Sequence, residues 1–457
     1  MMKNFDGDDK IMNEQWINKV HQGHVLNILK QMPSELVDCV ITSPPYWALR
    51  DYKTEPIVWD GKLDCEHEWE NIVSIHHKKN DDINKIKFRM GNANIPKETN
   101  LCSKCSAWKG SLGLEPTFDL YIKHLCDIFD EVKRVMKKTG TLWVNLGDTY
   151  SGSQSTNSSV KSTNQFNQHM KDCYREDALN KETGLTSKSL CMIPYRFAIE
   201  MVNRGWILRN VLIWKKPNCM PSSAKDRFTV DFEYLFFFAK NKKYFFETQY
   251  EPFKSEPTKL RDKTNEGYGK AFLTPLGKGL RNGYEQGARN KRTVWTITTK
   301  GFSESHFAVF PEELVETPIK AGCPEFVCSK CGKAREKIYK KQGIPIYDEK
   351  GKPEGMERSK MKWNKSHPNN NPRWWSTDKQ IGYSSCSCNA PFVSGIVMDI
   401  FMGSGTTAKV AKDLKRDWIG IELNGDYVQL VNERVAGFQR SDWKAKKTHK
   451  TLKEMIR

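Results

Sequence analysis

The feature that most constrains the fold is a strand, a glycine turn and a helix that follow one another late in the chain. Residues 395–400 (GIVMDI) predict a buried strand, and Gly403-Ser404-Gly405 follows it directly. Residues 406–414 have helical spacing, and residues 418–422 (WIGIE) indicate another strand. A strand that passes through such a turn into a helix is typical of α/β folds, where the helix N-terminus faces an anionic ligand group.

This unit predicts a site for an adenosine-containing cofactor. Glycines in the turn let the backbone approach a ligand closely. Glu422 closes the next strand about 20 residues on, where an acidic side chain can hold ribose hydroxyls. Dinucleotide-binding proteins share this pattern, so a nicotinamide-dependent oxidoreductase also fits the turn.

A second motif, TSPPYW, follows another predicted strand at residues 38–42. The two prolines end that strand, so Ser43, Pro44, Pro45 and Tyr46 lie in a loop at its carboxyl end. The Ser43 side-chain oxygen and the Pro44 carbonyl are two acceptors that can polarise a poorly nucleophilic amino group. Tyr46 offers a face on which an extruded base can stack. The alternative is a purely structural role, in which the same segment is a Pro-Pro turn followed by two aromatic residues that pack in the core.

Alternating helix and strand patterns between these motifs predict an α/β sheet. Residues 120–137 have helical spacing, Gly140 breaks the pattern, and residues 141–146 indicate a strand. Residues 207–214 and 232–239 predict a hairpin with a long loop. Residues 151–170 are rich in Ser, Asn and Gln, which is typical of a mobile loop.

The composition indicates a soluble protein with a polyanionic partner. The chain has 457 residues and a net charge of +18, an excess that favours DNA or RNA, although a merely basic protein gives the same number. Its charged N-terminus has no signal peptide pattern, and no apolar run is long enough to span a membrane. We therefore expect a cytoplasmic protein with reduced or metal-bound cysteines.

Two sets of cysteine and histidine residues have the composition of zinc sites. One set is Cys65, His67, Cys102 and Cys105; the other is Cys328, Cys331, Cys386 and Cys388. The closely spaced pairs favour structural Zn²⁺, and the second set is the stronger. Reduced thiols on polar loops are the alternative.

Basic and aromatic residues alternate between residues 251 and 300. Such a segment can contact phosphates and base edges, and Arg289, Lys291 and Arg292 are the candidate DNA-binding residues. A solvated basic loop is the alternative.

Taken together, TSPPYW and the later MDIFMGSGTT and WIGIEL resemble the DNA N4-cytosine/N6-adenine amino-methyltransferases. The catalytic motif precedes the cofactor motif, as in the permuted, beta-type order of that family. Further similar segments are GHVL at residues 23–26, residues 140–148, WKKPN at residues 214–218, and HFAVFPEEL at residues 306–314. The sequence departs from the family at His24, where Asp is common, and at Ile400, where Pro is common.

The resemblance implies an S-adenosylmethionine-dependent methyltransferase with a Rossmann-like, mostly parallel and circularly permuted sheet, acting on an amine of a base flipped out of double-stranded DNA. Ser43, Pro44, Pro45 and Tyr46 would be catalytic. The residues that would bind the cofactor are Asp399, Phe401, Gly403, Ser404, Gly405, Thr406, Thr407 and Glu422. Ser43 favours cytosine N4 over adenine N6 as the target, because Ser is frequent in the N4 enzymes at this position.

The expected organisation has eight segments. They are a catalytic half with TSPPYW (1–60), a zinc-knuckle insertion (61–110), the catalytic half continued (111–250), a target-recognition region (251–300), a return to the catalytic domain (301–322), a second zinc-knuckle insertion (323–390), the cofactor-binding half (391–440) and a basic tail (441–457). A non-catalytic zinc protein that binds nucleic acid is a remote alternative. A bacterial or phage source is expected, while a partner restriction endonuclease and the oligomeric state stay open.

Overall fold

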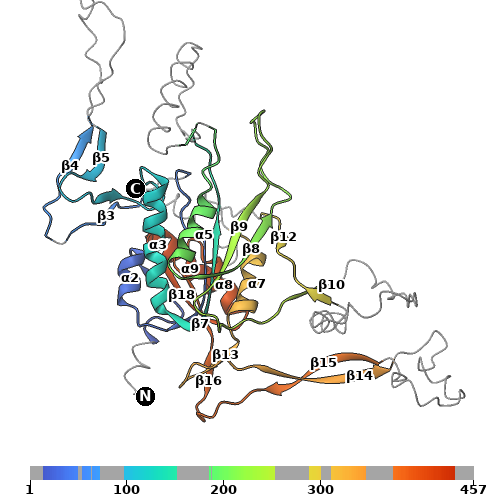
Figure 1. The fold of residues 1–457 in the computed structure, drawn as a ribbon. Coiled ribbons are helices and arrows are strands. Elements are labelled where there is room, and N and C mark those ends of the chain that lie inside the picture. The colour runs from blue at the N-terminus through green and yellow to red at the C-terminus, as the bar shows by residue number, and fades with distance from the viewer. Residues whose placement is uncertain are drawn as a thin grey trace, which may run out of the picture.

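A computed structural model places the predicted elements around one large sheet (Figure 1). The structure describes residues 14–49, 54–62, 64–72, 97–151, 185–186, 188–252, 288–299, 310–345 and 374–437. The expected mobile loop (apart from Ser151), most of the target-recognition region and the basic tail lie outside these residues.

The main sheet has eight strands, and five of its seven neighbouring pairs are parallel. Their order is β1 (Lys19–Gln22), β18 (Asp417–Glu422), β17 (Ile396–Asp399), β2 (Val37–Thr42), β7 (Met136–Leu146), β9 (Phe232–Ala239), β8 (Ile207–Lys215) and β12 (Val294–Thr296). The mostly parallel, permuted sheet is therefore confirmed, as is the antiparallel hairpin of β8 and β9.

Helices cover both faces of this sheet. The helices are α2 (Val25–Gln31), α3 (Phe118–Val135) and α5 (Ile193–Asn203) on one face, and α7 (Glu312–Gly322), α8 (Thr406–Asp413) and α9 (Gly425–Val435) on the other. β2 is buried along its whole length, with Val40 in the core under α3 and Ile41 in the core under α7. A strand buried on both faces has the apolar composition that DCVIT shows. None of the described helices has both the length and the apolar character that a membrane span requires.

The expected break at Gly140 is wrong, because the strand continues through it. α3 begins at Phe118, where the Thr117 hydroxyl accepts a hydrogen bond from the Leu120 N–H, and it ends at Val135. β7 starts at the next residue and passes through Gly140. A Cβ there would lie 3.0 Å from the Lys137 carbonyl oxygen, so glycine suits a close backbone approach.

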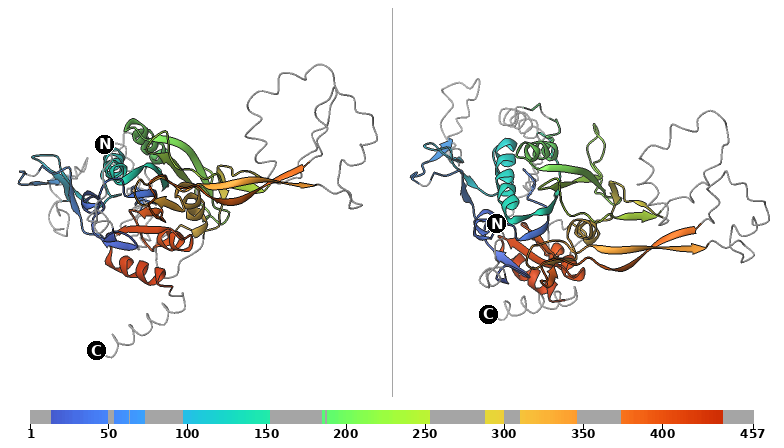
Figure 2. Two further views of the ribbon diagram at one scale, coloured as in Figure 1. Left: turned by 90° about the horizontal axis from the view of Figure 1, so that it is seen from below. Right: turned by 60° about the horizontal axis from the view of Figure 1, so that its bottom comes forward.

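Two smaller β structures project from the body at opposite sides (Figure 2). One is a four-stranded sheet of β3 (Ile57–Trp59), β6 (Trp108–Gly110), β5 (Lys97–Cys102) and β4 (Trp69–Ile72). The other includes the long ribbon of β14 (Lys337–Pro345) and β15 (Trp374–Tyr383), whose base is formed by β13 (Phe326–Cys328) and β16 (Phe392–Ser394). A short pair, β10 (Tyr250–Pro252) with β11 (Ala288–Asn290), lies near this ribbon.

Candidate active site

A cavity of about 670 Å³ opens where the carboxyl ends of β18, β17 and β2 meet. This edge of an open α/β sheet is where ligands bind. The cavity brings together the two motifs that lie about 350 residues apart in the chain, as the permuted order requires. Its lining from these motifs includes Ser43, Pro44, Pro45, Tyr46, Phe401, Gly403, Ser404, Thr406 and Glu422.

The glycine turn has the backbone that its sequence demands. Gly403 and Gly405 have φ values of +51° and +80°, the left-handed region that favours glycine. A Cβ on Gly405 would also lie 3.1 Å from Val431 of α9. The Glu422 carboxylate accepts a hydrogen bond from the Gly403 N–H (2.8 Å), which holds the turn against the next strand.

Asp399 joins the two motifs directly. Its side chain is fully buried and accepts hydrogen bonds from the Thr42 and Thr407 hydroxyls, both at 2.7 Å, and from the Phe401 N–H at 3.1 Å. Burial raises the pKa of Asp399 to about 6, against the opposing effect of these hydrogen bonds. Burial also raises the pKa of Glu422. The carboxylates that border the cofactor turn are thus poised to gain from a cationic ligand.

The hydroxyls at the start of α8 are held from within the protein. Arg434 of α9 donates hydrogen bonds to the Ser404 hydroxyl (3.2 Å) and the Thr406 hydroxyl (3.0 Å), and it pairs with Glu312 at 2.9 Å. An anionic group bound at the N-terminus of α8 would therefore contact a turn whose hydroxyl groups are already held in place by hydrogen bonds from Arg434.

Ser43, Pro44 and Pro45 of the TSPPYW loop line the cavity. The Tyr121 hydroxyl donates to the Pro45 carbonyl at 2.8 Å, so that acceptor is already engaged within the protein. Trp47 is buried against Phe118 and donates to the Glu115 carbonyl at 3.0 Å. Tyr46 instead lines the cavity. Trp47 is thus a packing residue, whereas Tyr46 both packs against the core and lines the cavity, and its stacking role stays a prediction.

Three polar residues that the sequence reasoning missed surround the catalytic loop. The Tyr46 hydroxyl lies 3.0 Å from Asn145 Oδ1 and 2.9 Å from Glu233 Oε2, and the Ser43 hydroxyl lies 3.4 Å from Asn145 Oδ1. Asn145 also donates to Glu233 (3.1 Å), which forms an ion pair with Lys216. All three line the cavity. Asn145 and Glu233 are polar side chains within otherwise apolar strands, which was the available signal for them, whereas Lys216 follows the end of β8.

His24, at the position where the family resemblance led us to expect Asp, also lines the cavity. Burial, with a smaller contribution from Lys30, lowers its pKa to about 4, so the ring is neutral at pH 7. Its Nδ1 has no hydrogen-bond partner among the described residues, and its ring packs edge-on against Trp59 at 5.1 Å. A neutral imidazole here offers a hydrogen bond where an aspartate would offer a charge.

The four-stranded sheet forms a further wall of the cavity. Trp59 of β3 and Gly110 of β6 line it. Trp59 and Trp108 stack on the His124 ring at centroid distances of 4.5 and 5.7 Å. The buried His124 contacts Glu115 at 3.1 Å. This packing fixes the wall against α3, the helix behind the catalytic loop.

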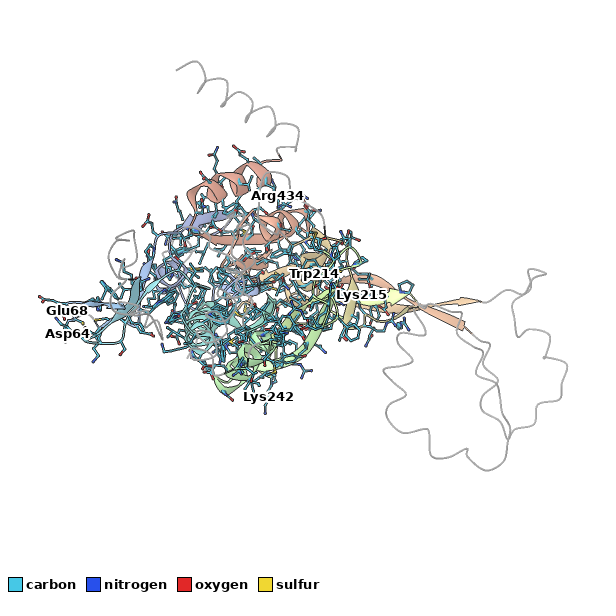
Figure 3. The ribbon with its side chains drawn as sticks, turned by 90° about the horizontal axis from the view of Figure 1, so that it is seen from above. Asp64, Glu68, Trp214, Lys215, Lys242 and Arg434 are labelled. Carbon is cyan, nitrogen blue, oxygen red and sulfur yellow. The ribbon has the colours of Figure 1, made fainter. Side chains whose placement is uncertain are left out.

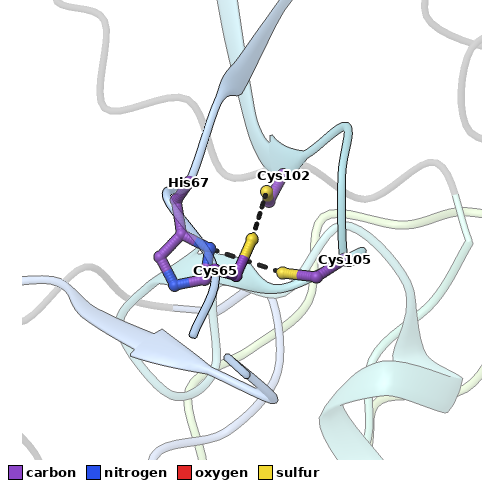
Figure 4. A group of neighbouring side chains, drawn as sticks. All are labelled: Cys65, His67, Cys102 and Cys105. Atoms are coloured by element: carbon purple, nitrogen blue, oxygen red, sulfur yellow. Dashed lines mark hydrogen bonds between the residues drawn. The ribbon is translucent and has the colours of Figure 1, made fainter. Parts of the chain in front are cut away.

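Each predicted metal set comes together in space. The ligand atoms of each set lie within 4.8 Å of one another. In the first set, Cys65 Sγ lies 3.9 Å from Cys102 Sγ, and Cys105 Sγ lies 3.4 Å from His67 Nδ1 (Figure 4). A Zn–S bond of about 2.3 Å implies S···S edges of about 3.8 Å in a tetrahedron. The residues therefore fit a zinc ion.

The three candidate DNA-binding residues lie together beside the β10–β11 pair. Arg289 and Arg292 both contact the Glu251 carboxylate, at 2.8 and 2.5 Å. Lys291 donates to the Thr317 hydroxyl at 2.8 Å and lies over the Trp295 ring. Two guanidinium groups share one carboxylate, which leaves an excess of positive charge at this surface.

The sheet, the glycine turn and the paired acceptors define an amino-methyltransferase of the S-adenosylmethionine-dependent class. A family model described as DNA methylase, for N6 and N4 methyltransferases, matches residues 37–433. The chain therefore belongs to this DNA methylase family, and the resemblance in its motifs is confirmed. The enzyme is an S-adenosylmethionine-dependent DNA amino-methyltransferase.

Individual relatives are similar over nearly the whole chain. The Type II methyltransferase M.SmaI of Serratia marcescens is 28% identical over 417 residues, which is 91% of this chain and 90% of that protein. M.XycI of Xanthomonas campestris pv. cyanopsidis, also named a Type II methyltransferase, is 28% identical over 91% of this chain and 87% of its own. Among solved structures, the PvuII DNA methyltransferase (cytosine-N4-specific) has a TM-score of 0.43 at 14% identity, over 93% of this chain and 90% of that chain. That degree of likeness leaves the target base open.

Cofactor affinity should fall as the pH drops through about 6. S-adenosylmethionine carries sulfonium and ammonium charges, so it favours ionised Asp399, and protonation of a carboxyl with a pKa of about 6 removes that attraction. Calorimetry at pH 7.5 and 5.5 should show weaker binding at the lower pH. Asp399→Asn, at the end of β17 beside the glycine turn, should flatten this dependence, whereas Asp413→Asn, at the far end of α8, should not. If the wild type binds S-adenosylmethionine equally well at both pH values, Asp399 does not contribute to cofactor binding through its charge.

Removal of the Tyr46 ring should slow methyl transfer more than removal of its hydroxyl. Stacking of a base on an aromatic ring contributes about 1–3 kcal/mol, so Tyr46→Ala should lower kcat/KM by roughly 5- to 150-fold. Tyr46→Phe keeps the ring and loses only the contacts to Asn145 and Glu233. Methyl incorporation into DNA measures both, with cofactor binding as the control. Equal losses in the two variants would contradict stacking.

Proposed function

We propose that the enzyme methylates the N4 atom of a cytosine that has been rotated out of the DNA duplex. The observation that carries this proposal is that Ser43 and Pro44 line the same cavity as the glycine turn, with Ser43 Oγ and the Pro44 carbonyl as the two candidate acceptors. Bound S-adenosylmethionine would supply the methyl group, held by the turn residues and by Asp399 and Glu422. The two acceptors would hold the amine protons and draw the nitrogen toward tetrahedral geometry.

Lys216 supports cytosine over adenine. Its ammonium group is held by Glu233 and lies 4.3 Å from the centre of the Trp214 ring. Next to its amine, cytosine presents two acceptors, N3 and O2, whereas adenine presents N1 and then a C–H group. A cationic donor at the cavity therefore suits the cytosine edge. Trp214 itself is buried within the central body of the molecule (Figure 3).

Nucleoside analysis tests the target base. DNA methylated by the purified enzyme should yield N4-methylcytosine after digestion and mass spectrometry, and Ser43→Ala should yield far less. Lys216→Met should weaken methylation of cytosine while leaving cofactor binding close to that of the wild type. N6-methyladenine as the sole product would overturn the cytosine assignment and leave the family assignment intact.

We also propose that Arg289, Lys291 and Arg292 contact DNA phosphates. This proposal is supported by the excess of positive charge around Glu251, where two arginines share one carboxylate at the border of the expected target-recognition region. Phosphate contacts of this kind set the register on the duplex and carry no sequence information. Because the similar proteins are named Type II methyltransferases, we further propose that this enzyme modifies the recognition site of a restriction system.

Each cysteine set is proposed to hold one structural zinc ion. In the first set, burial raises the pKa of the Cys102 thiol, but hydrogen bonds from His67 and the nearby backbone lower it overall. In the second set, hydrogen bonds from Cys388 and Cys331 lower the pKa of Cys386, whereas hydrogen bonds with Cys386 and Cys331 raise the pKa of Cys388. Burial raises the pKa of Cys65 in the first set. Thiolates are the form that binds zinc. The first ion would order the cavity wall and the second the base of the β14–β15 ribbon.

Elemental analysis of freshly purified protein should find about two zinc ions per chain, one for each four-ligand set. Cys65→Ser should weaken cofactor binding, because the zinc ion that Cys65 would help to hold stabilises the sheet that supplies Trp59 and Gly110 to the cavity. Cys331→Ser is the matched control: it should lower the melting temperature without comparable loss of cofactor affinity, since its cluster contributes no lining residue. Protein that lacks zinc and is unaffected by chelators would reject both sites.

A further inference from the structure

The two most exposed large apolar side chains of the described residues belong to one loop. Phe228 is 97% and Met220 is 87% exposed, and both lie between β8 and β9. The next such side chain, Ile199 of α5, is 63% exposed. A single exposed apolar residue needs no explanation. Two that are almost wholly in water, on the same loop, point to a surface that becomes covered in a complex.

This loop, residues 216–231, extends beyond the ends of β8 and β9 (Figure 1). Lys216 begins it and Glu233 follows it, and both line the cavity. The Lys216 N–H donates to the Asp231 carbonyl at 2.7 Å, which closes the base of the loop. Asn218 exchanges hydrogen bonds with Thr299, another lining residue, at 3.0 Å. The two apolar side chains are therefore carried by a loop rooted at the site itself.

The loop is held in place by contacts along its length. The Arg227 guanidinium lies 3.6 Å from the centre of the Tyr150 ring, and Asp226 pairs with Lys188 at 3.2 Å. Tyr150 follows the carboxyl end of β7, so these contacts tie the loop to the same edge of the sheet as the catalytic loop. Met220 and Phe228 thus project from an anchored segment.

We propose that Met220 and Phe228 form a wedge that enters the duplex when the target base leaves it. The partner is double-stranded DNA, the substrate of the family to which the chain belongs. Residues 216–231 carry three basic and two acidic side chains, a small positive balance that favours a phosphate backbone. Apolar side chains of the same kinds separate base steps in other DNA-binding proteins.

The wedge would offset part of the cost of extruding the base. Rotation of a base out of the helix breaks its pairing and stacking, and it leaves an apolar gap between the neighbouring bases. Phe228 and Met220 would lose their exposure to water in filling that gap, which is favourable for apolar side chains. This inference rests on the proposed rotation of the target base out of the duplex.

The test compares paired with mispaired targets. Met220→Ala/Phe228→Ala should lower kcat/KM on a fully paired duplex by about tenfold or more, because extrusion then lacks its apolar filler. The same variant should approach the wild-type rate when the target base is mispaired, since little pairing is left to break. Ile199→Ala is the control, as an exposed apolar side chain on another element. Cofactor binding and melting temperature should be unchanged in both variants.

A fluorescent base analogue next to the target reports extrusion directly. The wild type should raise its fluorescence on binding, and the double variant should raise it much less at saturating protein. Equal loss of activity on paired and mispaired duplexes would overturn the wedge, as would no loss on either. A wild-type protein that methylates neither duplex would count against the proposed function rather than against the wedge.

Discussion

The pairing of β2 with β17 is the contact on which the site depends. It joins segments about 350 residues apart, and two aspartates reinforce its ends. Asp38 accepts hydrogen bonds from the Ile396 N–H (2.9 Å) and Lys137 (2.7 Å), and Asp399 accepts one from Thr42. Because both strands are parallel and end together, their loops meet over one cavity. The order of the two motifs along the chain is thus immaterial to the geometry of the reaction.

The sequence predicted the parts of the site that are encoded locally. TSPPYW and the glycine turn are contiguous, and their backbone constraints follow from proline and glycine alone. Asn145, Glu233 and Lys216 could not be assembled in this way. Glu233 faces Trp214 only through the antiparallel register of β8 and β9, and register depends on long-range packing that one sequence does not display. The break expected at Gly140 was wrong because glycine there serves a close approach rather than a turn.

The two cysteine sets could be predicted from the sequence only in part. Spacing within each pair is local, whereas the partnership of pairs depends on how β4, β5 and β6, or β13 and β16, come together. Nothing in the sequence indicated that the first cysteine set supports a wall of the active-site cavity. Only the structure shows that its sheet supplies Trp59 to the cavity and that Trp59 packs on the buried His124. An insertion remote from the motifs thereby becomes a wall of their site.

The charges of the cavity divide it into two halves. Beside the glycine turn, Glu422 lines the cavity, and Asp399 is fully buried at the end of the strand before the turn. Burial makes both carboxylates costly to ionise, a cost that a cationic ligand would relieve. On the base side, the carboxylate of Glu233 is already matched by Lys216, so this half presents little net charge to a neutral base. A methyl group that moves from a sulfonium to an amine carries positive charge across this boundary. In the proposed mechanism, the Ser43 and Pro44 oxygens would accept hydrogen bonds from the amine as that charge develops, a role that neutral acceptors can fill without a charged base.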